Sequence, residues 1–67
     1  MELEHKEFLN QHINNYETAL SGYVRNIDLP ILKMYEHIYR TYIDAGFILT
    51  IWCAFCRIDM ILRLYKH

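Results

Sequence analysis

The sequence predicts an all-α protein, a single domain over residues 1–67 folded as a three-helix bundle with helices at about 2–21, 29–42 and 45–65. The chain has only two glycines and one proline, and this scarcity of turn residues favours a few helices joined by short connections over an all-β fold. Apolar residues also recur every three or four positions, which is the spacing of one helix face. With 54% hydrophobic and 22% charged residues, intrinsic disorder is not expected.

The first predicted helix, residues 2–21, has one narrow apolar side. Leu9, Ile13, Tyr16 and Leu20 are spaced four, three and four positions apart, so they line up on one face. Gly22 follows directly, and glycine just after a helix end is a frequent C-terminal cap.

The second predicted helix, residues 29–42, begins within the connector Tyr23–Pro30. Asp28 is suited to cap its N-terminus, and Pro30 is tolerated within a first turn because the N–H that proline lacks has no partner there. Its apolar side is formed by Ile31, Tyr35, Ile38 and Tyr42.

The third predicted helix, residues 45–65, contains the run FILTIWCAFC at 47–56, which has one hydroxyl and no charge. A continuous helix is preferred because the apolar pattern is longer than a strand. The alternative is that residues 48–51 are extended, since they include β-branched side chains. In that case the helix would start near Thr50 or Trp52.

A continuous third helix would be apolar on two opposite sides. One side consists of Phe47, Ile51, Phe55, Ile58, Leu62 and Tyr65, and it can pack against the first two helices. A three-helix bundle has nothing left to cover the other side, and an exposed apolar patch usually marks an interaction site. The predicted protein-binding residues are therefore those of the second side: Leu49, Trp52, Cys53, Cys56, Met60 and Leu64. In an alternative arrangement, the third helix is central and the other two cover both sides.

This pattern predicts a non-catalytic protein-interaction module that acts through the C-terminal helix. The partner would be a second copy of the chain, giving a homo-oligomer, or another protein, and Trp52 would be the anchor. The sequence has no glycine-rich phosphate loop and no nucleophile motif, so we expect neither an enzyme nor a cofactor.

A small helix-turn-helix-like DNA-binding regulator is the alternative function. Arg57, Arg63, Lys66 and His67 give the third helix a mildly basic end. The net charge of −1 supplies little attraction for phosphates, and the first half of that helix lacks polar donors for base edges. Nucleic acid is therefore the less favoured partner.

The Cys53-Ala-Phe-Cys56 motif gives a second alternative, a metal-binding or redox protein. A metal site would need two further ligands, and a redox pair would need a lowered thiol pKa, typically at a helix N-terminus. A helix start near Thr50 would favour the redox interpretation. With a continuous helix both cysteines are simply small apolar residues, so no metal site is predicted and Cys53 and Cys56 are only its candidates.

The uncharged stretch 45–56 would reach about 18 Å as a helix, whereas a bilayer core is about 30 Å thick. We therefore expect no membrane span. Two cysteines are too few for a secreted disulfide scaffold, which favours an intracellular, cytoplasmic location.

Residues 38–65 also show a resemblance, carried by Tyr42, Asp44, Cys53, Cys56, Leu64 and Tyr65. The stretch resembles small Cys-x-x-Cys helical proteins from phages and mobile elements of gut Bacteroidetes. The resemblance implies an accessory role that works by binding a host or phage protein, and it implies no catalytic residue.

Overall fold

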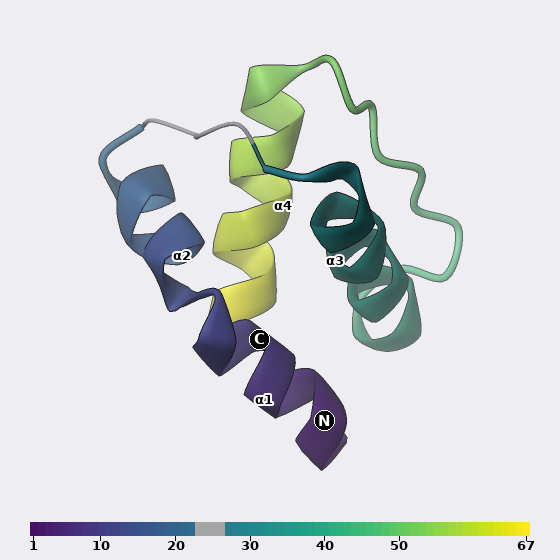
Figure 1. Ribbon diagram of the computed structural model, residues 1–67. Coiled ribbons are helices and arrows are strands. Elements are labelled where there is room, and N and C mark those ends of the chain that lie inside the picture. The colour runs from purple at the N-terminus through teal and green to yellow at the C-terminus, as the bar shows by residue number, and fades with distance from the viewer. Residues whose placement is uncertain (23–26) are drawn as a thin grey trace.

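The computed structural model describes residues 1–22 and 27–67, and within them the chain forms four α-helices (Figure 1). These are α1 (Leu3–Gln11), α2 (Ile13–Leu20), α3 (Leu29–Tyr42) and α4 (Ala54–Lys66). The predicted all-α class is confirmed, while the predicted three-helix bundle is wrong. Two differences account for this: the first predicted helix is broken in two, and the third begins later than expected. At both places the backbone is hydrogen-bonded to side chains from distant parts of the sequence.

The predicted helix 2–21 is broken at His12, which separates α1 from α2. A buried tyrosine of α3 and a partly buried tyrosine of α4 bind the backbone at this point. The Tyr65 hydroxyl donates to the Leu9 carbonyl at 2.6 Å, and the Tyr35 hydroxyl donates to the His12 carbonyl at 3.4 Å. Side-chain groups that take over backbone carbonyls in this way interrupt the i→i−4 ladder and bend a helix.

Gly22 ends α2 as predicted. It has a φ of 80°, and its N–H donates to the Ala19 carbonyl at 2.9 Å. A positive φ costs glycine little because it has no Cβ. The next residues of the predicted connector, 23–26, lie outside the described part of the chain.

Helix α3 has the predicted bounds, and Pro30 lies in its first turn. Asp28 precedes the helix, but its side chain makes no capping hydrogen bond. Its backbone carbonyl instead accepts from Ile31 and Leu32, at 3.0 and 3.1 Å.

The third predicted helix begins nine residues later than expected, at Ala54 rather than at 45. Two charged side chains of α3 bind the backbone of the segment before it. Arg40 donates from Nε to the Phe47 carbonyl at 2.6 Å, and Glu36 accepts the Leu49 N–H at 2.7 Å. Residues 47 and 49 thus make hydrogen bonds to α3 in place of helical ones, and the alternative start near Trp52 is closer to the structure.

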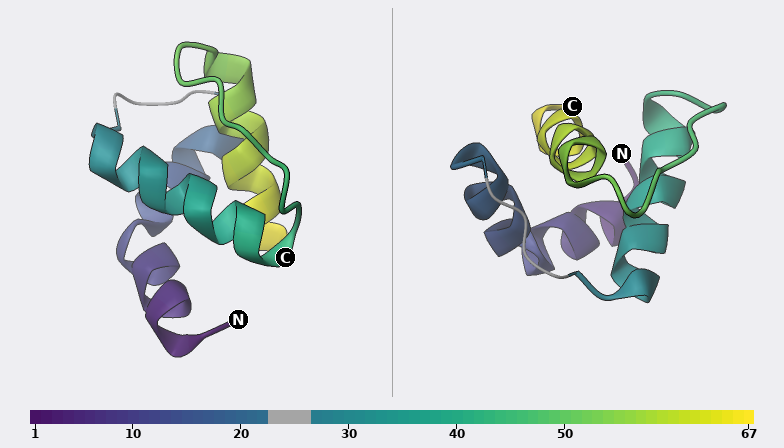
Figure 2. Two further views of the ribbon diagram at one scale, coloured as in Figure 1. Left: turned by 90° about the vertical axis from the view of Figure 1, so that its right-hand side faces the viewer. Right: turned by 90° about the horizontal axis from the view of Figure 1, so that it is seen from above.

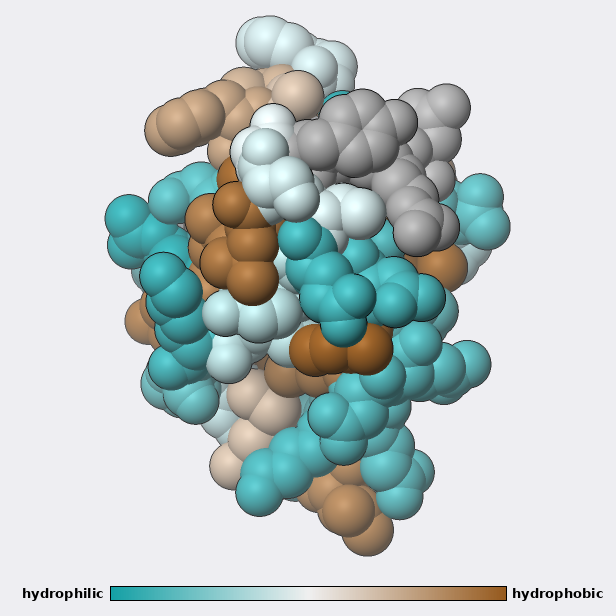
Figure 3. Space-filling model, turned by 90° about the vertical axis from the view of Figure 1, so that its left-hand side faces the viewer, coloured by the Kyte–Doolittle hydropathy of each residue, from teal (hydrophilic) through white to brown (hydrophobic). Residues whose placement is uncertain are grey.

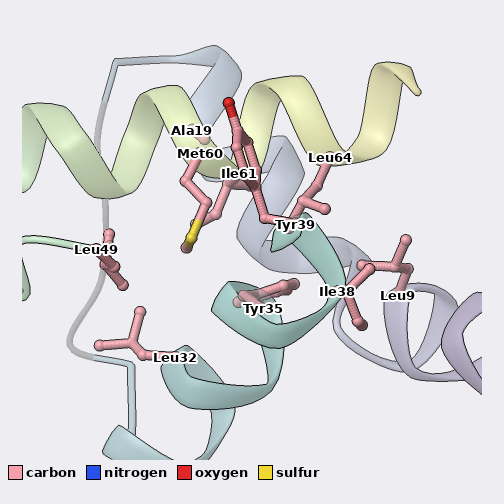
Figure 4. Close-up of a cluster of buried hydrophobic side chains, with 10 residues drawn as sticks. All are labelled: Leu9, Ala19, Leu32, Tyr35, Ile38, Tyr39, Leu49, Met60, Ile61 and Leu64. Atoms are coloured by element: carbon pink, nitrogen blue, oxygen red, sulfur yellow. The ribbon is translucent and has the colours of Figure 1, made fainter. Parts of the chain in front are cut away.

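Helix α4 is the centre of the fold. It packs against both α2 and α3, and the view from above shows it between them (Figure 2). Its buried residues Met60, Ile61 and Leu64 belong to one hydrophobic core with residues of α1, α2 and α3 (Figure 4). In its central C-terminal helix, this arrangement is closer to the alternative with the third helix in the middle than to the predicted three-helix bundle.

Among the described residues, no helix combines the length and the apolar content that crossing a membrane would require.

Candidate functional site

The structure separates the six residues predicted to bind protein into two groups. Leu49, Met60 and Leu64 are only 7%, 1% and 1% exposed, respectively, and belong to the core. The expectation that these three residues lie on an uncovered side of the helix is wrong. Leu49 does not lie on α4 at all, and α2 and α3 cover the side of α4 that carries Met60 and Leu64. Trp52, Cys53 and Cys56 remain fully or partly accessible.

The accessible apolar residues around Trp52 form a different set from the predicted one. Trp52 is 86% exposed, Phe55 77%, Ile48 76% and Ile51 38%. We refer to Ile48, Ile51, Trp52 and Phe55 as the apolar cap, because they lie on the segment that leads into α4 and on its first turn. The pattern of a continuous helix places Ile51 and Phe55 on its buried side, and the structure exposes both. For Ile51, the β-branched composition of residues 48–51 is the sequence signal that indicates the non-helical backbone.

The first turn of α4, which contains Phe55 and follows shortly after Trp52, is the end of that helix farthest from both chain termini (Figure 1). A different face of the molecule, on the α2 side, is mostly hydrophilic, with its apolar side chains in separate groups (Figure 3). Exposed apolar residues that occur singly are normal, whereas a contiguous exposed apolar patch usually marks an interaction site.

The segment that carries the apolar cap is held in place although it is not helical. Besides the bonds from α3, Arg57 Nη1 donates to the Ile51 carbonyl at 2.6 Å, and the Cys53 N–H donates to the Thr50 carbonyl at 3.1 Å. Phe47 packs against Tyr39, with 4.1 Å between the ring centroids. The apolar side chains are therefore displayed on an ordered backbone.

The two cysteines lie at the N-terminus of α4. Cys53 is the N-cap residue, and its Sγ accepts the backbone N–H of Cys56 at 3.2 Å. The side-chain hydrogen bond from Cys56 lowers the pKa of the Cys53 thiol, and the nearby Arg57 guanidinium acts in the same direction. The pKa of the Cys56 thiol is raised, first by its hydrogen bond to Cys53 and then by burial. The two thiols therefore differ in how readily they ionise.

No group of three or more metal-ligating side chains occurs among residues 1–22 and 27–67. Both cysteines are free thiols there. The described residues thus offer the pair no additional ligands, so a tetrahedral site of the zinc type would lack half of its donors.

Two of the basic residues considered for DNA binding already have partners within the chain. Arg57 is bonded to the Ile51 carbonyl, and Arg63 lies 3.1 Å from the Asp59 carboxylate. The DNA-binding alternative stays a prediction without further support.

Comparisons with protein-family models, with curated proteins and with solved structures found no match to this chain. The resemblance to phage and mobile-element proteins therefore also stays a prediction, and the candidate sites depend on the geometry alone.

Proposed function

We propose that this chain is a protein-interaction module that associates with a second copy of itself through the apolar cap. The observation that carries the proposal is the exposure of Ile48, Trp52 and Phe55, each more than three-quarters accessible to solvent. Leaving such side chains in water forfeits about 25 cal/mol for each Å² that could be buried.

The size of the cap suits the centre of an interface. An aromatic side chain buries roughly 150–250 Å², so the two aromatic residues and the two isoleucines together expose apolar surface on the order of 500 Å² per copy. A stable interface uses about 800 Å² per partner, so the cap would be its apolar core within a polar rim. Tryptophan is a preferred anchor residue in such cores.

A second copy is the simplest occupant because a two-fold axis lets one patch cover itself. The cap carries no charged side chain of its own, so pairing two caps brings no like charges together within it. The association itself requires no catalytic residue and no cofactor. The proposal includes the intracellular location expected from the sequence, where both thiols would be kept reduced.

Sedimentation velocity in the presence of a thiol reductant tests this proposal. We expect the apparent mass to rise from one copy to two as the concentration is raised through the micromolar range, and Trp52→Glu to abolish the rise. Leu3→Glu is the matched control, because Leu3 is also exposed, at 70%, but lies in the first turn of α1. A wild-type chain that stays monomeric at high micromolar concentration would overturn self-association and leave a different protein as the partner.

A further inference from the structure

The environment of Cys53 favours a thiolate for reasons that are independent of the apolar cap. An N-cap side chain faces the unpaired N–H groups and the positive end of the helix dipole, and here the Cys56 N–H is directed at the Cys53 sulfur. The positive charge of the following residue, Arg57, lowers the pKa of the Cys53 thiol further, by less than the hydrogen bonds from Cys56 do.

Arg57 is held at this position in an unusual way. Its Nη1 is bonded to the Ile51 carbonyl at 2.6 Å, while its Nε is buried and has no hydrogen-bond partner among the described residues. A buried charged donor without a partner is costly, and the great majority of buried polar groups in proteins have one. A thiolate on Cys53 is an anion that this guanidinium would stabilise.

Cys56 has the complementary properties. It is the third residue of α4, and its backbone N–H donates to the Cys53 sulfur at 3.2 Å. Its interaction with Cys53, burial and the negative charge of Asp59 raise the pKa of its thiol. Its thiol thus stays protonated under conditions in which Cys53 ionises. An accessible thiolate beside a protonated thiol is the arrangement needed for stepwise reduction of a disulfide.

We propose that Cys53 and Cys56 form a thiol–disulfide exchange site, with Cys53 as the attacking residue and Cys56 as the resolving residue. The substrate class is a disulfide, either of a small thiol or of a polypeptide. The Cys53 thiolate attacks one sulfur of the substrate, forms a mixed disulfide and expels the other sulfur as a thiolate. Cys56 then loses its proton, attacks the Cys53 sulfur and releases the second substrate thiolate.

The overall reaction converts the dithiol to a Cys53–Cys56 disulfide. Two electrons pass to the substrate, whose two sulfurs leave as thiols after taking up the proton from Cys56 and one from solvent. No metal or other cofactor takes part. The reaction is independent of self-association, so the two proposals can fail separately.

The experiment uses the full chain, reduced and freed of reductant, with oxidised glutathione as the small disulfide and insulin as the protein disulfide. Products are identified by intact mass, and the rates are followed at neutral pH. We expect the wild type to end as an intramolecular disulfide, having lost two hydrogens. Cys56→Ser should stop at a mixed disulfide with glutathione, and Cys53→Ser should react at least about tenfold more slowly than Cys56→Ser.

Both serine variants keep a hydroxyl where the thiol stood, and serine is itself a good N-cap residue, so they are matched to each other. Repeating the glutathione reaction in denaturing urea supplies the control, because the two variants should then react at the same rate. Reaction with insulin as well as glutathione would assign polypeptide disulfides to the site, and reaction with glutathione alone would assign small ones. Equal rates of the two variants in the folded state, or a wild type that accumulates only mixed disulfides, would overturn the proposal.

Discussion

The hydroxyl of Tyr65 joins three helices at the place where the N-terminal helix breaks. It donates to the Leu9 carbonyl at the end of α1 at 2.6 Å and is hydrogen-bonded to the hydroxyl of Tyr35 in α3 at 2.9 Å. Tyr35 is also bonded to the Asn15 side chain at 3.2 Å. Replacing Tyr65 by phenylalanine removes the hydroxyl and keeps the ring, so it tests whether these bonds stabilise the fold.

Two hydrogen bonds are lost in Tyr65→Phe, and each contributes about 0.5–1.5 kcal/mol net. The expected loss of unfolding free energy is therefore about 2 kcal/mol. A core of this size rarely supplies more than about 3–5 kcal/mol, so the effect is a large share of the total. With a urea slope of about 1 kcal/mol per M for a small protein, the midpoint of unfolding should fall by roughly 2 M. Far-UV circular dichroism during urea titration measures this shift.

A double-mutant cycle with Tyr35→Phe distinguishes the shared bond from unrelated effects. We expect the double variant to be less destabilised than the sum of the two single variants, with a difference of at least about 0.5 kcal/mol. Strictly additive losses, or a Tyr65→Phe variant within about 0.5 kcal/mol of the wild type, would show that this network does not hold the three helices together.

Three further measurements test other contacts of the fold. Leu49→Ala should cost about 2–4 kcal/mol of unfolding free energy. Ile48→Ala at the neighbouring, 76% exposed position should cost under about 0.5 kcal/mol. Equal effects of the two variants in urea titrations would contradict the placement of segment 44–53. Glu36→Ala should cost about 1–3 kcal/mol of unfolding free energy, because it removes the charged acceptor of the Leu49 N–H. It should also speed proteolysis between residues 44 and 53. An unchanged cleavage rate would show that this hydrogen bond does not hold the segment in place. Burial raises the pKa of Tyr65 above the usual 10.0, so the contribution of its neutral hydroxyl to stability is complete below about pH 10 and is lost as the pH rises further. The midpoint temperature of thermal unfolding should therefore fall more steeply above pH 10 in the wild type than in Tyr65→Phe. Parallel pH curves for the two proteins would refute this.

The sequence was a good guide wherever the structure is decided by neighbouring residues. Helix α3 has the predicted bounds because proline in its first turn and the apolar spacing are local signals. Gly22 is likewise a local signal, and it ends α2 with a positive φ.

The sequence was a poor guide where distant side chains decide the backbone. The sequence around His12 contains no proline or glycine that would break a helix. The carbonyls there instead accept hydrogen bonds from Tyr35 and Tyr65, which are more than 20 positions away. Residues 45–53 are apolar enough for a helix, but the side chains of Glu36 and Arg40 bind their backbone instead.

The exposure of the predicted site residues was correct in part. Trp52 is exposed, while its role as an anchor and the redox role that a late helix start would favour stay predictions. Met60 and Leu64 were wrongly predicted to be exposed, because a helical-wheel projection of one helix does not show how many other helices pack against it. Their burial follows from the central position of α4 between α2 and α3.

Trp52 has a practical consequence as the single tryptophan of the chain. Because its indole is 86% exposed in the folded protein, its emission spectrum should change little on unfolding, and fluorescence would be a misleading gauge of stability. The same indole adjoins Cys53 and stands where a second molecule would dock. Its intrinsic fluorescence can therefore report the binding of another molecule near the N-terminus of α4 without an added dye.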